Sequence, residues 1–149
     1  LAKKLRGVHT IFMETDCGYQ MSGFRFERVR REFSEINSAS AEQIYGDKFT
    51  KGEDEVTGIG NNVVLDFGEF DFTDEQPSKL VICGRSPLPL NSIHLTAGTE
   101  RILCEFRTEG ESGYVEREFP LDGIAGKQNM SFTFLPGSDF DFRSFRFEK

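Results

Sequence analysis

The chain has 149 residues, of which 25 are acidic and 18 basic, giving a formal net charge of −7 at pH 7. A chain of this length is one domain on average and can bury a core of its own. Both signs of charge are interspersed, which excludes the basic stripe that nucleic-acid phosphates require. No apolar run approaches the roughly 20 residues that cross a bilayer. We therefore expect neither a nucleic acid nor a membrane as a partner.

The beginning of the chain repeats part of its end. Residues 7–13 alternate in polarity after a glycine and are followed by Phe24-Arg25-Phe26-Glu27. Near the C-terminus, residues 126–134 show the same Gly-led alternation and are followed by Phe145-Arg146-Phe147-Glu148. A tetrad that recurs after a similar strand indicates an internal repeat.

The repeat predicts where the domain begins. We interpret residues 1–35 as the last two strands of a preceding, similar module followed by a linker, and residues 36–149 as one complete module. An isolated strand pair is marginally stable in water. We therefore expect it to pack on a sandwich or to pair with an edge strand.

Alternating apolar residues, the period of a half-buried strand, recur through the rest of the chain. In chain order these runs are 63–67, 70–72, 80–83, 93–95, 102–106, 115–121, 130–134 and 140–147. Clusters of Gly, Pro, Asp and Ser separate them and mark turns. The 16 Phe and the absence of Trp indicate a core built on phenylalanine. Together these features predict an all-β sandwich or barrel.

The alternation changes phase at two places. One is Gly68, where the inward face passes from Phe67 to Phe70, and the other is around Arg143-Ser144. A phase change within a strand is typical of a β-bulge or a bend, and glycine is common there. We therefore predict irregular pairing at both positions.

The cysteines predict neither a metal centre nor a disulfide framework. Cys17, Cys83 and Cys104 are odd in number and form no CxxC pair. Cys83 and Cys104 lie in apolar runs, where a small buried hydrophobic residue is the favoured interpretation. A Cys83–Cys104 bridge between neighbouring strands is the alternative.

No catalytic group stands out. His9 and His94 lie in strand-like runs without further ligands at metal-binding spacing, so structural histidines are favoured over a metal site. Glu53-Asp54-Glu55 and the pair Asp139/Asp141 could supply acid and base carboxylates, but exposed acidic turns are far commoner. No nucleophile with an adjacent base is recognisable. We expect a non-catalytic domain.

Four segments carry a family resemblance. They are Ile44 to Phe49, Val56 to Val63, Ile82 to Pro87 and Phe134 to Phe142. Their order and spacing over residues 36–149 resemble the C-terminal domain of certain bacterial glycoside hydrolase family 2 β-galactosidases. That domain is similar to carbohydrate-binding module family 6. The resemblance implies a jelly-roll, galactose-binding-like β-sandwich.

The resemblance also implies a sugar cleft at the loop end of the sandwich, where two aromatic side chains and an Asn hold the ligand. Asp141 takes the place of the Asn, and Tyr114 corresponds to the second aromatic. The loop that supplies the first aromatic offers Asn61 and Asn62 instead. With Arg85, these side chains would hydrogen-bond the hydroxyl groups of a sugar.

The structural calcium that the resemblance implies is not expected here. Its ligands are carboxylates of the first strand and the Asp of the final strand. The first-strand match is Tyr45-Gly46-Asp47, and Arg143 replaces the final Asp. We expect no metal and no other cofactor, with Arg143 pairing with Asp47 in place of the ion.

These inferences lead to a carbohydrate-binding accessory module of a β-galactosidase-like glycoside hydrolase. Its partners would be a glycan, galactoside-containing ones included, and the upstream catalytic domain of the same chain, which it would keep near its substrate. The alternative is a structural or assembly domain of the same enzyme without sugar affinity. The missing aromatic side chain in the loop of Asn61 and Asn62 and the absence of Trp favour this alternative. Clustering of Asp141 with Asn61 and Asn62 would favour sugar binding. The sequence does not indicate the compartment: we expect a bacterial protein that is either cytoplasmic or secreted with its parent enzyme.

Overall fold

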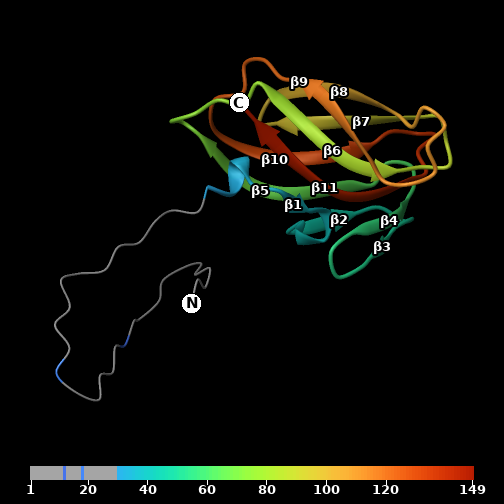
Figure 1. Cartoon of the computed structure of the whole chain (residues 1–149), viewed down its shortest axis with the longest axis horizontal. Helices are drawn as coiled ribbons and strands as arrows, with labels where there is room; N and C mark the ends of the chain where they lie inside the picture. Colours follow the sequence, from blue (N-terminus) through green and yellow to red (C-terminus); the bar gives the residue numbers. More distant parts are fainter. Residues whose placement is uncertain (1–11, 13–17, 19–29) are drawn as a thin grey trace. The chain divides into compact units, whose positions relative to one another are not determined.

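A computed structural model describes Phe12, Gly18 and residues 30–149 (Figure 1). The predicted strand pair at the N-terminus and His9 lie outside the described residues. Residues Arg31–Lys149 form one compact unit. No helix in the described part of the chain is long and apolar enough to cross a membrane.

The described strands form two antiparallel sheets, which Figure 1 shows as two layers. The strands of sheet A are β1 (Ile36–Asn37), β3 (Thr50–Lys51), β4 (Val56–Ile59), β6 (Lys79–Arg85), β9 (Val115–Pro120) and β11 (Phe140–Glu148). The strands of sheet B are β2 (Gln43–Tyr45), β5 (Val64–Phe72), β7 (Leu90–Ala97), β8 (Glu100–Arg107) and β10 (Gly126–Phe134). Short 3-10 turns, η1 (Arg31–Phe33) and η2 (Ser38–Ser40), precede and follow β1.

The strand order confirms the predicted all-β jelly-roll sandwich. Sheet A runs β3-β4-β11-β6-β9, with β1 pairing to a further part of β11, and sheet B runs β2-β5-β10-β7-β8. The two last strands of the chain are thus central strands of different sheets. β4 and β1 pair with successive parts of β11, so the segments before β1 and β4 lie along one edge of that strand.

Phenylalanine fills the space between the sheets, as the composition predicted. The rings with almost no exposure are Phe67, Phe70, Phe72, Phe106, Phe132, Phe134, Phe140, Phe142, Phe145 and Phe147. Many meet edge to face, the favoured geometry for aromatic rings. For example, the Phe145 centroid lies 4.7 Å from that of Phe67 and 4.8 Å from that of Phe132.

Both predicted phase changes are bulges. In the β5–β10 pair, Asn129 faces Glu69 while Ser131 faces Asp66, and Gly68 between them has a φ of +70°. In the β11–β6 pair, the register shifts between Phe142 and Ser144, which leaves Arg143 as the extra residue. This shift keeps the rings on both sides of Arg143 in the core while its own side chain reaches solvent.

The disulfide alternative is wrong. Cys83 and Cys104 are free thiols on β6 and β8, which belong to different sheets. Cys104 faces the core, and burial raises its pKa to about 12. Cys83 is half-buried and pairs across strands with Ser144 and Glu116 of sheet A. The two thiols form no disulfide, and their strands lie in different sheets. Cys104 is a small buried hydrophobic residue, as the sequence favoured.

The compact unit starts before the predicted boundary at residue 36. The Arg31 guanidinium donates to the carbonyl of Phe67 and lies 4.2 Å from the ring centroid of Phe70. At the other end of the chain, Lys149 Nζ lies 5.4 Å from the ring of Phe33. Residues 31–35 are thus attached to the sandwich by cation–π contacts and hydrogen bonding.

An ion-pair network covers the outer face of sheet A. Arg146 contacts both carboxylate oxygens of Glu116, at 2.7 and 2.9 Å, and donates to Glu148 at 2.8 Å. Lys79 also pairs with Glu148, at 3.0 Å. Hydrogen bonding to Arg146 lowers the pKa of Glu116, and hydrogen bonding to Lys79, followed by that to Arg146, lowers the pKa of Glu148. Val81 lies on the same face and is only 1% exposed.

This network predicts an acid-sensitive part of the stability. Because both pKa values are lowered by folding, the stabilisation is present above the unfolded Glu pKa of about 4.3 and is lost as the pH falls through the lower folded values. Arg146→Met should therefore cost most stability at neutral pH, with a gap to wild type that narrows below about pH 4. Urea unfolding across this range measures the gap. Lys127→Met, which breaks an exposed pair with Glu69, is the control, and a gap for Arg146→Met that stays constant in acid would contradict the prediction.

Candidate functional site

Two arginines, two carboxylates and a tyrosine meet on the outer face of sheet A. Tyr114 directly precedes β9, Arg85 ends β6, Asp141 and Arg143 lie on β11, and Glu55 directly precedes β4. Since β9, β6, β11 and β4 are neighbours in that order, the sheet brings together residues from distant parts of the sequence. These five residues are called the Tyr114 cluster below.

Asp141 joins three strands within the cluster. Its Oδ1 accepts the backbone N–H of Gly58 on β4 at 2.7 Å, and its Oδ2 accepts from Arg85 Nε on β6 at 2.8 Å. The hydrogen bond to Asp141 raises the pKa of Arg85 above its usual value. The Asp141 side chain keeps 22% of its surface exposed, so the remaining lone pairs are accessible from solvent.

Tyr114 is held at its hydroxyl and at its ring. The hydroxyl donates to Glu55 Oε2 at 2.6 Å. The guanidinium carbons of Arg143 and Arg85 lie 4.0 and 4.8 Å from the ring centroid, within the range of cation–π attraction. Burial, followed by the hydrogen bond to Glu55, raises the pKa of Tyr114 above its usual value. The tyrosine therefore stays neutral and in one orientation.

The two arginines keep donors for a ligand. Each contacts its carboxylate through Nε: Arg85 at 2.8 Å from Asp141, and Arg143 at 3.8 Å from Glu55. Their side chains are 44% and 52% exposed. Within residues 30–149 the Nη nitrogens of both make no hydrogen bond, and neither arginine pairs with a second carboxylate. A guanidinium has five N–H groups, so each arginine can still donate several hydrogen bonds.

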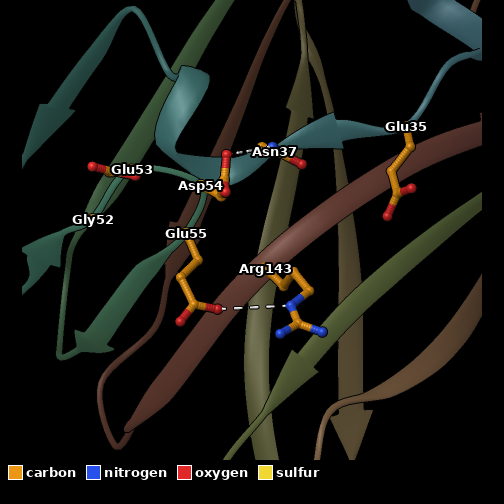
Figure 2. A pocket seen from close by; sticks show the side chains of 7 residues that line it. All are labelled: Glu35, Asn37, Gly52, Glu53, Asp54, Glu55 and Arg143. Carbon is orange, nitrogen blue, oxygen red and sulfur yellow. Dashed lines mark hydrogen bonds and ion pairs between the residues drawn. The ribbon is translucent and has the colours of Figure 1, made fainter.

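A pocket of about 560 Å³ adjoins the cluster (Figure 2). It is lined by Glu35, Asn37, Gly52, Glu53, Asp54, Glu55 and Arg143. Figure 2 shows the Arg143 side chain on β11 reaching toward Glu55, with Glu35 further along the same edge of β11. Asn37 Nδ2 donates to Asp54 Oδ1 at 3.2 Å, which links β1 to the β3–β4 hairpin above β11. The pocket therefore lies where β1 and β4 meet along one edge of β11, and four of its seven lining residues are acidic.

Comparison with solved structures shows the fold. A family 6 carbohydrate-binding module from Clostridium stercorarium, solved with cellobiose, aligns with a TM-score of 0.67 at 16% identity over 79% of this chain and 95% of its own. A family 6 module from Clostridium cellulolyticum, solved with xylose, gives 0.65 at 19% identity over 79% and 98%. A glycoside hydrolase family 43 arabinoxylan arabinofuranohydrolase from Bacillus subtilis gives 0.62 at 19% identity over 79% of this chain but 27% of its own.

The chain has the fold of a family 6 carbohydrate-binding module. No protein-family model matches its sequence, and neither does any curated protein. The similarity to these structures is thus a similarity of fold. What the site can bind has to be argued from its own residues.

The fold brings together three of the five predicted site residues, Arg85, Tyr114 and Asp141. Asn61 and Asn62 lie in the turn between β4 and β5. Asn61 Oδ1 accepts the backbone N–H of Gly137 at 2.7 Å. Asn62 has a φ of 59° and donates its backbone N–H to Phe134 O at 2.7 Å. These contacts attach the turn to the end of β10 and to the loop that follows it.

Sequence reasoning missed the roles of Glu55 and Arg143. The acidic run was interpreted as an exposed turn, which holds for Glu53 and Asp54, but Glu55 is half-buried and bonded to Tyr114. Arg143 pairs with Glu55, so the expected pairing with Asp47 is wrong. The sequence carries only a weak signal for Glu55, because this residue is the last of the hairpin loop and its partners are far away in sequence.

The residues present do not fit the calcium site that the resemblance implies. Within the described part of the chain, no three or more His, Cys, Asp or Glu side chains are grouped so that they could hold a metal ion. Arg143 brings a positive charge to the acidic edge of β11, 3.8 Å from Glu55. A guanidinium has no acceptor lone pair, so Arg143 cannot act as a metal ligand in place of the Asp that it replaces.

The contacts of Asp141 predict a measurable loss of stability. Asp141→Ala removes the acceptor for Gly58 N–H and for Arg85. Hydrogen bonds that involve a charged group contribute about 1.5–3 kcal/mol each, and the partial exposure of the pair with Arg85 reduces its share. We expect the free energy of unfolding to fall by about 2 kcal/mol. Asp141→Asn keeps the acceptor for Gly58 and should lose less.

Asp139→Ala is the matched control. The Asp139 carboxylate has an exposed partner, Lys48, at 3.9 Å. Its loss should cost less than about 1 kcal/mol. Equal losses for Asp139→Ala and Asp141→Ala in urea unfolding would show that Asp141 does not join the strands as described.

Proposed function

We propose that this chain is a non-catalytic carbohydrate-binding module whose glycan site is the Tyr114 cluster. The observation that carries the proposal is the pair of half-exposed guanidinium groups on Arg85 and Arg143, held on the Tyr114 ring beside two carboxylates. The similar folds solved with cellobiose and with xylose support a sugar as the ligand.

The chemistry of the cluster suits sugar hydroxyl groups, which both donate and accept hydrogen bonds. The Nη groups of Arg85 and Arg143 can donate hydrogen bonds to hydroxyl oxygens, and Asp141 and Glu55 can accept hydrogen bonds from hydroxyl groups. The donors and acceptors are already fixed by contacts within the protein, so little side-chain entropy is lost when a ligand binds. Tyr114 provides the rigid apolar surface against which the arginines lie.

Asn61 and Asn62 would contribute from the neighbouring turn. Asn61 uses its amide oxygen to bind Gly137, which leaves the amide NH2 as a donor toward solvent. Both residues are exposed, so an extended glycan can reach them after passing the cluster. In this proposal they are outer contacts and the Tyr114 cluster is the centre of the site.

The parent chain in this proposal is a bacterial β-galactosidase-like glycoside hydrolase, and the module keeps its catalytic domain near galactoside-containing substrate. The support is the resemblance of the four sequence segments, together with the family 43 enzyme from Bacillus subtilis, in which the matching part is 27% of the chain. Residues 1 to about 30 would then be the last two strands of a preceding module. In the described copy of the repeated tetrad, Phe145 and Phe147 fill the core while Arg146 and Glu148 form the outer ion pairs.

Binding to oligosaccharides tests the proposal directly. Calorimetry with cello-oligosaccharides, xylo-oligosaccharides and galactosides should give a micromolar to millimolar Kd for at least one of them. Tyr114→Ala removes the surface that orders both arginines and should weaken this binding about tenfold or more. Tyr45→Ala removes an aromatic ring that is 53% exposed on β2 of sheet B and should leave the affinity unchanged.

The outcomes separate the alternatives. No binding by a folded protein would favour the structural or assembly domain without sugar affinity. Binding that is lost in Tyr45→Ala but kept in Tyr114→Ala would transfer the glycan site to sheet B and would contradict the assignment to the cluster.

We also propose that the module folds and binds without calcium, since Arg143 already supplies a cation beside Glu55. Melting temperatures with added calcium and with a chelator should agree, and so should the sugar affinities. A clear calcium-dependent rise in melting temperature would contradict this part of the proposal.

A further inference from the structure

We infer that the Tyr114 cluster selects neutral glycans and excludes acidic ones, because carboxylates of the adjoining pocket, which form no ion pair within the described residues, repel uronate and sulfate groups. This inference rests on the proposed glycan-binding function and names the class of ligand. It concerns what the acidic pocket rejects, and it assigns no ligand to the pocket itself.

Two exposed arginines would by themselves attract an anionic sugar. In this module each arginine already has a carboxylate partner: Asp141 at 2.8 Å from Arg85, and Glu55 at 3.8 Å from Arg143. The formal charges of the cluster therefore cancel. The remaining Nη donors can still bind hydroxyl groups, but they have no net positive field with which to attract an anion.

The pocket adds negative charge beside this neutral cluster. Arg143 and Glu55 belong to the cluster and also line the pocket. The pocket has three further carboxylates, on Glu35, Glu53 and Asp54. The hydrogen-bond donors to these carboxylates are neutral: Ser144 Oγ donates to Glu35, and Asn37 Nδ2 donates to Asp54. Within the described residues no cation lies in an ion pair with any of the three, so the local balance is negative, as is the whole chain at −7.

The size of the effect can be estimated from Coulomb's law. A unit negative charge about 8 Å from three carboxylates in water is disfavoured about tenfold at low ionic strength. At physiological salt, where the Debye length is about 8 Å, the factor falls to about threefold. A neutral sugar of the same shape feels neither effect. Specificity of this kind arises from a repulsive element and not from a better contact.

Two matched pairs of polymers test the inference. Glucuronoxylan is compared with its carboxyl-reduced form, and carboxymethylcellulose with hydroxyethylcellulose, so that each pair differs mainly in charge. Affinity electrophoresis and calorimetry measure binding at about 0.01 M and about 1 M salt, where the Debye length is about 30 and about 3 Å. We expect the neutral member of a bound pair to bind about tenfold more tightly at low salt, with the gap closing at high salt.

The triple variant Glu35→Gln, Glu53→Gln, Asp54→Asn removes the three carboxylates without removing an acceptor. Amide oxygens can still accept from Ser144 and Asn37, and all residues of the Tyr114 cluster stay in place. We expect this variant to bind neutral polymers as the wild type does and to lose most of the discrimination against acidic ones.

The control variant Glu69→Gln, Glu100→Gln, Glu105→Gln makes the same change in net charge on sheet B. These residues are exposed on β5 and β8, away from sheet A. We expect the wild-type discrimination to persist, because screening confines the effect of an exposed charge to its surroundings.

The inference is overturned if the acidic member of a pair binds as tightly as the neutral one at low salt, or if the two triple variants narrow the gap equally. In both cases the neutral polymer still binds, so the proposed function survives. If the folded wild type binds no member of either pair and no oligosaccharide, the proposed function fails, and this inference is overturned with it.

Discussion

The bulge in β11 between Phe142 and Ser144 is the constraint on which both the core and the site depend. A regular strand would turn alternate residues inward and would expose either Phe142 or Phe145. The extra residue lets both rings stay in the core and leaves Arg143 on the outer face. The same strand thus closes the sandwich on one side and supplies a guanidinium to Tyr114 and Glu55 on the other.

The order of strands around β11 determines which groups meet. β6 on one side brings Arg85 to Asp141, and β4 on the other brings Glu55 to Arg143 and the Gly58 N–H to Asp141. Because these pairs are partly exposed, their net contribution to stability is modest. Their main effect is orientation: side chains that would otherwise move freely are held by several short contacts.

Charge is distributed unevenly over sheet A. Toward the end of β11, Arg146 and Glu116 belong to a network of ion pairs that covers Val81. Toward its beginning, the formal charges of the Tyr114 cluster cancel, but the neighbouring pocket is acidic. If the Tyr114 cluster is the glycan site, as proposed, its neutrality and the acidic surface beside it favour uncharged ligands, since screening limits but does not abolish repulsion over such distances.

The sequence by itself determined the all-β sandwich, the phenylalanine core and both bulges, because alternation of polarity and its phase changes are local signals. It also indicated Arg85, Tyr114 and Asp141, through the resemblance. Only the tertiary structure decided that Glu55 and Arg143 complete the cluster, that Asn61 supports a neighbouring turn, and that the two strand cysteines lie in different sheets. These facts depend on which strands are neighbours, and pairing between strands far apart in the sequence leaves no periodic pattern in a single chain.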